Sequence, residues 1–361
     1  MNAAQQLNEI GQSLWLDNIT RSLLSSGTLG RYINEWAVTG LTSNPSIFNL
    51  AIGKSADYDD DIHALLKKGK SSEELFFDLA QSDLAQAADL FRPVYDRTDG
   101  VDGWVSLEVS PLLAYDTKKT IEDAKKLHAQ ANKPNLFIKI PGTPEGIPAI
   151  EEAIFAGVPV NVTLLFSREH YLAAAEAHLR GVERRIAAGL NPSICSVASL
   201  FISRWDAAIA DKVPADLKNK LGIAIGQDCY KAYCDFLTSP RFLRAHNKGA
   251  SAQRLLWAST GTKDPAAPDT LYVEAFAAPF TVNTIPEPTL KAFADHGKVG
   301  DVLKADGGDG AAVLARFAAA GVDTTALAAR LQKEGAESFV KAWTELMKVI
   351  EGKSEALKKV G

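Results

Sequence analysis

The sequence predicts an α/β protein that folds as a closed (β/α)8 TIM barrel with additional C-terminal helices. The first observation is that short β-rich runs alternate with longer amphipathic segments along the 361 residues. A repeated strand–helix–strand order implies parallel strands joined by right-handed crossovers. The second is the number of such units, because about eight of them fit a closed barrel better than an open sheet. The third is that polar residues recur inside these otherwise apolar runs, which points to an interior site.

Runs rich in Val, Ile, Leu, Thr and aromatic residues are expected to form the strands. In chain order they are Ser13–Ile19, Val38–Asn44, Gly103–Ser110, Asn135–Ile140, Val160–Phe166, Ile194–Phe201, Arg254–Ser259 and Phe280–Ile285. Amphipathic helices are expected between them, most clearly over Ser72–Tyr95, Thr117–Ala131, Gly146–Ala156 and Ser167–Ala188. Asp116 or Thr117 can cap the second of these helices.

The chain beyond Pro286 has a different character. A glycine-rich loop around residue 308 is followed by Ala-rich helical stretches. The last stretch predicts a helix packed on the outside of the barrel, because one helical face carries Phe339, Trp343, Met347 and Ile350. No internal domain boundary is recognisable. We therefore expect a single domain over residues 1–361, with the barrel at about 13–290 and a helical appendage at about 291–361.

The composition excludes several classes of protein. With 46% hydrophobic and 23% charged residues, the chain is of the globular type and neither disordered nor fibrous. The net charge of -5 argues against a nucleic-acid surface, which needs a basic excess. Neither a signal peptide nor a membrane-spanning apolar run is recognisable. We expect a cytoplasmic enzyme with small-molecule substrates and without nucleic-acid or membrane partners; monomer and homodimer both stay open.

The cysteines and histidines give no sign of a metal centre. Cys195, Cys229 and Cys234 fit neither a CxxC redox motif nor a zinc site. The six histidines form no HExxH pair or other ligand cluster, so no metal is expected. Cys195 is expected in the sixth strand, near the pocket described next.

The residues that indicate a function are polar side chains within apolar strands. Lys139 stands between Ile138 and Ile140, and because side chains alternate across a strand, it is expected to face the barrel axis. The same parity places further residues inside the barrel, namely Asp17, Thr42, Asn44, Glu108, Asn161, Thr163, Ser199 and Phe201. Each is expected in the C-terminal half of its strand or at its end. Barrel enzymes have their active sites at that mouth, so one pocket is predicted.

A buried lysine at this mouth suggests covalent chemistry. Burial disfavours the charged ammonium and leaves a neutral amine that can attack a carbonyl. Asp17 and Glu108 can then transfer protons. The alternative is that Lys139 only forms a buried ion pair with Asp17 or Glu108. That alternative accounts for one isolated lysine, but less well for a whole set of buried polar groups at one mouth.

Basic residues follow the later strands. Arg204 comes after the sixth strand, and Lys263 comes after the seventh, with Ser259 between them. Loops in this part of a barrel often bind phosphate, which suggests a phosphosugar, although either residue taken singly could be a surface cation.

The sequence resembles the transaldolase family over almost all of the expected barrel. The motifs that match, in order, are LWLDNI, GLTSNPSIF, SLEVSP, IKIPGTPEGIPAI, VNVTLLFS, SLFISRWD and TVNTIP. The segment LLWASTGTKDP and the chain length resemble the longer bacterial and cyanobacterial branch. The resemblance implies a class I Schiff-base enzyme without metal or organic cofactor. It would move a dihydroxyacetone unit from sedoheptulose 7-phosphate to an aldose phosphate in the non-oxidative pentose phosphate pathway.

The resemblance also implies a role for each matching residue. Lys139 would form the Schiff base with the ketose C2 carbonyl, and Asp17 would exchange a proton with the C4 hydroxyl. Glu108, with Thr163, would hold a water that transfers protons during imine formation. The remaining residues would bind or line the sugar phosphate: Asn44, Asn161 and Ser199 at the three-carbon fragment, Arg204 at the phosphate, and Thr42, Phe201 and Ser259 around them.

One segment departs from the family pattern. Shorter transaldolases have an arginine after the seventh strand in an ASFR-like motif, whereas this chain reads ASTGTK over residues 258–263. We assign the second phosphate cation to Lys263.

Two other functions stay open at this point. The first is a fructose-6-phosphate aldolase-like enzyme that releases free dihydroxyacetone. Those aldolases are shorter, have a tyrosine in place of Phe201 and lack an acid matching Glu108, so both residues favour transfer. The second is a sugar-phosphate-binding barrel without catalysis, which would not be expected to keep a lysine together with its proton carriers.

Overall fold

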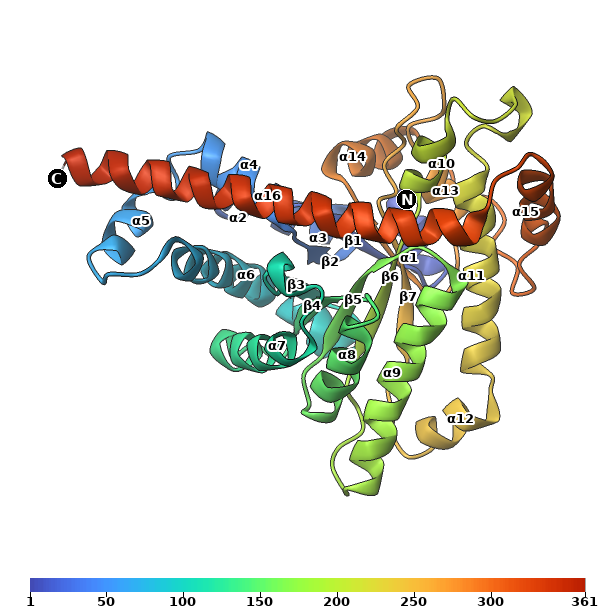
Figure 1. Cartoon of the computed structure of the whole chain (residues 1–361), viewed down its shortest axis with the longest axis horizontal. Coiled ribbons are helices and arrows are strands. Elements are labelled where there is room, and N and C mark those ends of the chain that lie inside the picture. Colours follow the sequence, from blue (N-terminus) through green and yellow to red (C-terminus); the bar gives the residue numbers. More distant parts are fainter. Residues whose placement is uncertain (361) are drawn as a thin grey trace.

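The computed structural model describes residues 1–360, with side chains up to residue 358, and it contains a closed barrel of parallel strands in sequential order (Figure 1). The strands are β1 (Ser13–Asp17), β2 (Val38–Thr42), β3 (Trp104–Glu108), β4 (Leu136–Pro141), β5 (Val160–Leu165), β6 (Ser196–Phe201), β7 (Gln253–Ala258) and β8 (Val282–Ile285). The predicted fold class is confirmed. Each expected strand is present, with its ends within two residues of the prediction.

Helices join the strands and cover the outside of the barrel. Up to β5 they are α1 (Ala3–Glu9), α2 (Arg21–Ser25), α3 (Thr28–Glu35), α4 (Pro45–Lys54), α5 (Asp59–Leu66), α6 (Ser72–Arg97), the 3-10 turn η1 (Pro111–Leu113), α7 (Thr117–Ala131) and α8 (Gly146–Phe155). The later ones are α9 (Arg168–Ala187), α10 (Ser203–Ile209), η2 (Ala215–Leu217), α11 (Leu221–Leu237), α12 (Pro240–His246), α13 (Leu271–Ala275), α14 (Glu287–His296), α15 (Gly310–Ala319) and α16 (Thr324–Val360). Of the two caps considered for α7, Asp116 is the one observed, since its carboxylate accepts from the Lys119 N–H at 3.0 Å.

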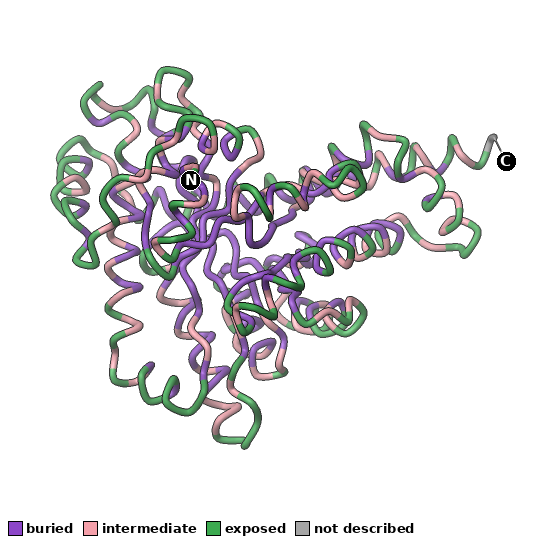
Figure 2. Tube along the Cα trace, turned by 180° about the vertical axis from the view of Figure 1, so that it is seen from behind, coloured by how far each residue is buried: buried purple, intermediate pink, exposed green. Residues whose placement is uncertain are grey.

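Large side chains fill the barrel interior, which is the buried centre of the molecule in Figure 2. The indole of Trp15 is fully buried and donates to Asp102 Oδ1 at 2.8 Å. Gly40 lies beside it on β2, where an added Cβ would come within 2.7 Å of Trp15 Nε1. Glycine is therefore needed at position 40 for β2 to pass this indole.

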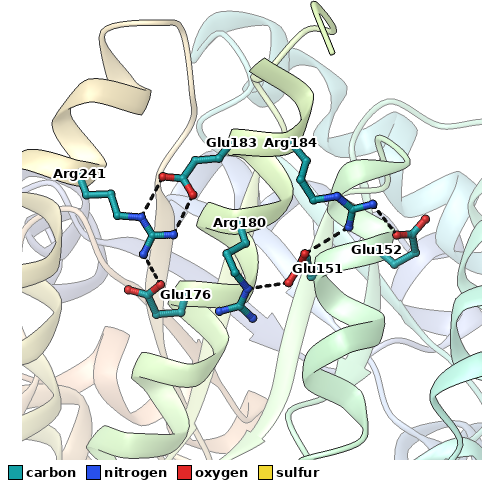
Figure 3. A network of polar contacts seen from close by, with 7 residues as sticks. All are labelled: Glu151, Glu152, Glu176, Arg180, Glu183, Arg184 and Arg241. Atoms are coloured by element: carbon teal, nitrogen blue, oxygen red, sulfur yellow. Dashed lines mark hydrogen bonds and ion pairs between the residues drawn. The ribbon is translucent and has the colours of Figure 1, made fainter. Parts of the chain in front are cut away.

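Ion pairs join the helices on one side of the barrel (Figure 3). Arg184 of α9 contacts both Glu151 and Glu152 of α8, at 3.2 and 2.9 Å. Arg241 of α12 donates two hydrogen bonds to Glu183 of α9, at 2.8 and 2.9 Å. The side chains are partly exposed, so this network orients three helices against one another rather than supplying much stability.

The last helix takes a different position from the one predicted. α16 runs across the mouth of the barrel and beyond it alongside α4, α5 and α6 (Figure 1). Trp343 of α16 packs edge-on against Phe76 of α6 with ring centroids 5.0 Å apart. Phe339, one turn earlier, lines the cavity at the mouth. The prediction that this face packs on the outside of the barrel was therefore wrong for Phe339: spacing identified the apolar face but not what it covers.

Within the described residues, no single helix is long and apolar enough to cross a membrane. Only α15 and α16 taken together, bent by 94° at their junction, reach the required length and composition.

His178 of α9 is predicted to make folding sensitive to acid. Its side chain is 2% exposed and Nε2 donates to the Ile194 carbonyl at 3.0 Å; burial lowers the pKa of His178 to about 4. The unfolded chain binds this proton near pH 6.5, so the stabilisation is complete above that pH and is lost as the pH falls toward 4. From pH 7 to pH 5 we expect a loss of about 2 kcal/mol of unfolding free energy from this group. Urea titrations at both pH values test this.

The matched comparison uses His178→Gln beside His63→Gln on α5. His178→Gln should reduce the difference in stability between pH 7 and pH 5, and His63→Gln should leave it unchanged. An unaltered difference in His178→Gln would show that another group causes the acid sensitivity.

Candidate active site

Side chains from the C-terminal ends of the strands surround a cavity of about 170 Å³. Of the predicted site residues, those that line it are Asp17, Thr42, Asn44, Lys139, Thr163, Ser199, Phe201, Arg204, Ser259 and Lys263. Glu108 and Asn161 do not line the cavity themselves. Glu108 contacts Lys139 and Asn161 contacts Ser199, and both of these partners line it. The structure thus brings these side chains together at one end of the barrel.

Lys139 and Glu108 form a buried ion pair on neighbouring strands. They are register partners across β3 and β4, which places both side chains on the barrel-facing side. Lys139 Nζ lies 3.1 Å from Glu108 Oε2 and donates to the Ser43 carbonyl at 3.2 Å. Each residue is 5% exposed. Burial raises the pKa of Glu108, and the nearby Lys139 ammonium opposes that rise.

Asp17 ends β1 and lines the same cavity. Its Oδ1 accepts from the Thr42 hydroxyl at 2.8 Å, and Thr42 is its register partner on β2. Because the Thr42 proton is used there, Thr284 of β8 must donate in the 2.6 Å contact between the two threonine hydroxyls. Burial raises the pKa of Asp17, opposed first by the charge of Lys139 and then by Thr42. A carboxyl whose pKa is raised in this way is a better proton donor than an ordinary aspartic carboxylate and can still accept a proton.

A layer of polar residues lies deeper in the barrel. Asn161 of β5 is the register partner of Lys139 and is fully buried. Its amide donates to Ser106 Oγ at 3.1 Å, and its carbonyl accepts from Ser199 Oγ at 2.7 Å. Asn161 is the second residue of β5, so its predicted place in the C-terminal half of the strand was wrong. The observed strand spans almost the same residues as the predicted one, Val160–Phe166, and Asn161 is the second residue of both.

β5 is irregular just after Thr163. Leu164 adopts φ 60°, and the pairing of β5 with β6 shifts register between Val162 and Leu165. Gln332 of α16 donates to the carbonyls of both Leu164 and Gly142 at 3.0 Å. The last helix therefore supplies hydrogen bonds to backbone carbonyls at the C-terminal ends of β4 and β5, where these strands form the site. Sequence analysis did not identify Gln332.

Two cations face the mouth in different surroundings. Arg204, at the start of α10, is half-buried, and its guanidinium lies 5.2 Å from the centre of the Phe201 ring. Burial lowers the pKa of Arg204, only partly opposed by Glu334, and no carboxylate of the described side chains lies within ion-pair distance of it. Lys263 lines the same cavity from the loop after β7 but is exposed. Both residues can contact an anion at the mouth.

α16 supplies two lining residues that sequence analysis missed as site residues. Ser338 and Phe339 both border the cavity, and the Phe339 ring centre lies 5.5 Å from Lys139 Nζ. The apolar spacing of α16 identified Phe339 as a packing residue, but only the fold shows that it packs above a lysine. The others missed are Ser46, Ala258, Gly261, Thr284 and Pro286.

Cys195 does not lie near this cavity. It precedes β6, at the N-terminal end of the strand, whereas the cavity is at the C-terminal end. The predicted position near the pocket was wrong because strand membership alone does not say which end of a strand a residue occupies. Among the described residues, no group of three His, Cys, Asp or Glu side chains is arranged to hold a metal ion.

Comparison with known proteins gives a consistent result. The model of the transaldolase/fructose-6-phosphate aldolase family matches residues 14–350. A protein of Neisseria gonorrhoeae named transaldolase is 42% identical over 348 residues, which cover 96% of this chain and 99% of that protein. Transaldolases of Arthrobacter sp. and Thermobifida fusca are each 44% identical, over 96% and 95% of this chain and 96% of their own length. The chain therefore belongs to the transaldolase/fructose-6-phosphate aldolase family.

Proposed function

We propose that the protein is a transaldolase, a transferase that moves a dihydroxyacetone unit from sedoheptulose 7-phosphate to glyceraldehyde 3-phosphate. The products are erythrose 4-phosphate and fructose 6-phosphate, and the reaction belongs to the non-oxidative pentose phosphate pathway. The observation that supports this most is Lys139, buried at the barrel mouth and paired with Glu108, in a chain whose relatives are named transaldolase. The reaction needs no metal or organic cofactor.

Lys139 is the nucleophile in this proposal. Its neutral amine adds to the ketose C2 carbonyl, and loss of water from the carbinolamine gives a protonated imine. The imine withdraws the electron pair of the C3–C4 bond when that bond breaks, so the three-carbon fragment remains as an enamine. Asp17 accepts the proton of the C4 hydroxyl as the aldehyde leaves, and it returns a proton when the acceptor aldehyde adds. Its half-buried position at the mouth and its raised pKa suit both directions.

Glu108 and Thr163 are proposed to position the water that transfers protons while the imine forms. Glu108 Oε1 and Thr163 Oγ1 are buried, and neither has a hydrogen-bond partner among the described residues. A buried oxygen without a partner is costly, and a shared water molecule would satisfy both. Lys139 Nζ, 3.1 Å from the Glu108 carboxylate, is then within one water of the proton carrier.

The remaining residues are proposed to bind the sugar phosphate. Asn44 caps α4 by accepting from the Ile47 N–H at 3.1 Å, which leaves its amide NH2 free for a substrate hydroxyl. Arg204 and Lys263 hold the phosphate. Asn161 and Ser199 bind hydroxyls of the three-carbon fragment. Around them, the cavity wall consists of Thr42, Phe201 and Ser259.

The whole chain, 1–361, is proposed to act as one domain in the cytoplasm, with sugar phosphates as its substrates. The helical segment from about residue 291 belongs to the working unit, because α16 brings Phe339 to the mouth.

The test of transfer compares two assays with fructose 6-phosphate as donor. Erythrose 4-phosphate should be consumed with formation of sedoheptulose 7-phosphate, and little free dihydroxyacetone should appear without an acceptor. Acceptor-independent release of dihydroxyacetone would instead identify a fructose-6-phosphate aldolase-like enzyme. Absence of both activities would favour a binding protein on the same scaffold.

Arg204→Ala is expected to lower kcat/KM selectively for phosphorylated substrates. Losing a charge-assisted contact to phosphate costs about 1.5–3 kcal/mol, which is a fall of about 10- to 100-fold in kcat/KM for fructose 6-phosphate. Unphosphorylated fructose should be affected little. Arg316→Ala on α15 is the matched control and should leave both substrates unchanged. An equal loss for both sugars in Arg204→Ala would contradict the phosphate role.

Phe339→Ala is expected to lower the fidelity of transfer. The ring lies above Lys139, where it shields the enamine from water, and premature protonation would release dihydroxyacetone. The ratio of released to transferred product should rise in Phe339→Ala. It should rise less in Phe339→Leu, because leucine keeps an apolar side chain above Lys139. A variant that loses both reactions in parallel would show that the ring only supports the fold.

A further inference from the structure

A second cavity, of about 480 Å³, opens at the N-terminal end of the barrel, opposite the active site. Trp104 and Phe137 form one wall at the starts of β3 and β4, with ring centroids 4.1 Å apart and planes at 20°. Leu237 and Phe242 line it from α11 and α12. We call this space the basal cavity. None of its lining residues takes part in the proposed transfer reaction.

The exposed rim of the basal cavity combines three apolar residues with Asp99 and His246. Val101, Leu243 and Phe280 are 50%, 43% and 42% exposed, and all three border the cavity. A mainly apolar cavity that opens to solvent between exposed apolar residues and a few polar ones is typical of a binding site rather than a packing defect.

Phe280 is held at this rim in an unfavourable backbone conformation. Its φ is 57°, in the left-handed region that is rare for an aromatic residue. The Phe280 N–H donates to the Gly11 carbonyl at 2.8 Å, and its carbonyl accepts from the Tyr233 hydroxyl at 2.6 Å. These two bonds fix the backbone of Phe280 where its ring faces Arg254. The guanidinium carbon of Arg254 lies 5.5 Å from the centre of the Phe280 ring.

Arg254 supplies the basal cavity with a cation that lacks a counter-charge. Its side chain lines the cavity and the residue is only 6% exposed. Nη1 donates to the Val101 carbonyl at 3.0 Å, and Nη2 donates to Ser13 Oγ and the Thr281 carbonyl at 2.6 and 2.9 Å. Nε is buried without a partner, and among the described side chains no carboxylate lies within ion-pair distance of Arg254.

The nearest compensation is indirect and incomplete. The Ser13 hydroxyl donates a hydrogen bond to one carboxylate oxygen of Asp102, and the other oxygen accepts from the Trp15 indole N–H. Asp102 is therefore separated from Arg254 by a hydroxyl. A buried cation without a direct carboxylate partner is costly, and an anion entering the basal cavity would reduce that cost.

Aromatic walls with a single cation define the ligand's chemistry. We propose that the basal cavity binds a small amphipathic anion: a planar aromatic body with one carboxylate or sulfonate group directed toward Arg254. The cavity volume lies within the range of small-molecule sites. A sugar phosphate is a poor fit, because the apolar walls offer few partners for its hydroxyls.

The test uses two fluorescent probes that differ by one group. 8-Anilino-1-naphthalenesulfonate has the aromatic body and the anion, whereas N-phenyl-1-naphthylamine has the same body and no charge. The folded protein should bind the sulfonate saturably at one site per chain, and fructose 6-phosphate should not displace it. Arg254→Gln should lower the affinity for the sulfonate about tenfold and the affinity for the neutral probe by much less. Arg244→Gln, an exposed cation of α12 outside the cavity lining, should change neither.

A second variant keeps the proposal testable if Arg254→Gln does not fold. Ser251→Trp places a large side chain in the lining and should abolish binding of both probes while transfer activity is retained. Undiminished probe binding in Ser251→Trp would overturn the proposal. So would displacement by fructose 6-phosphate, or an equal loss of both probes in Arg254→Gln. If the protein binds neither probe and Ser251→Trp splits a dimer in light scattering, the cavity accommodates a second copy and the proposal fails.

Discussion

Replacing Lys139 with methionine is expected to abolish transfer, with a loss of at least about 10⁴-fold in kcat. Methionine has a similar length and fills the same space, but it has no amine to form a carbon–nitrogen bond. The loss should be the same for every ketose, because no donor can be cleaved without the imine. The measurement is the rate of sedoheptulose 7-phosphate formation from fructose 6-phosphate and erythrose 4-phosphate.

The covalent step is tested separately from turnover. Borohydride reduction in the presence of fructose 6-phosphate should attach a reduced sugar fragment to Lys139, identified by mass spectrometry of the digested protein. Lys139→Met should give no adduct at any residue. An adduct of undiminished yield in Lys139→Met, or one located on another lysine, would disprove the Schiff-base mechanism.

A folding control is needed because Lys139 and Glu108 are buried together. Lys139→Met leaves the Glu108 carboxyl without its partner, and breaking a buried pair typically costs about 3–5 kcal/mol. The double variant Lys139→Met/Glu108→Gln removes both charges and should recover most of that stability in urea denaturation. It should remain as inactive as the single variant. Recovery of stability without activity separates the chemical role of Lys139 from its structural one.

The fold and the inner part of the site were predictable because each depends on local periodicity. Alternation along β4 is sufficient to place Lys139 on the barrel-facing side. The same alternation on β3 places Glu108 there, and the observed register pairs the two residues. What alternation does not give is depth along the axis. Asn161 shares the barrel-facing side with Lys139 but does not line the cavity, because depth along the axis depends on strand stagger.

The outer part of the site was not predictable from local patterns. Phe339 and Gln332 reach the mouth because α16 crosses it, and the path of a helix distant in sequence is set by tertiary packing. Its apolar face predicts burial but not the surface that it covers. Arg254 is a similar case at the other end of the barrel. As the second residue of β7 it was expected only as the start of a strand, and its missing counter-charge becomes visible only once its neighbours are known.

Replacing Glu108 with glutamine is expected to slow imine formation by about 10²- to 10⁴-fold, the usual contribution of a positioned acid or base. Glutamine keeps the shape of the side chain but cannot exchange a proton with a shared water. The KM for fructose 6-phosphate should change little, since Glu108 does not line the cavity where the sugar chain is proposed to bind. Steady-state kinetics with both substrates measure this split between kcat and KM.

The stage at which Glu108 acts is resolved by following adduct formation in time. With borohydride present, Glu108→Gln should reach the same final yield of adduct as the unaltered enzyme, but more slowly, because Lys139 is still available and only proton transfer is impaired. Glu108→Asp, which keeps the acid but retracts it, should fall between the two. A variant that forms the adduct at the normal rate yet turns over slowly would move the role of Glu108 to the cleavage step. A raised KM with unchanged kcat would mean that the carboxylate contributes to binding and not to proton transfer.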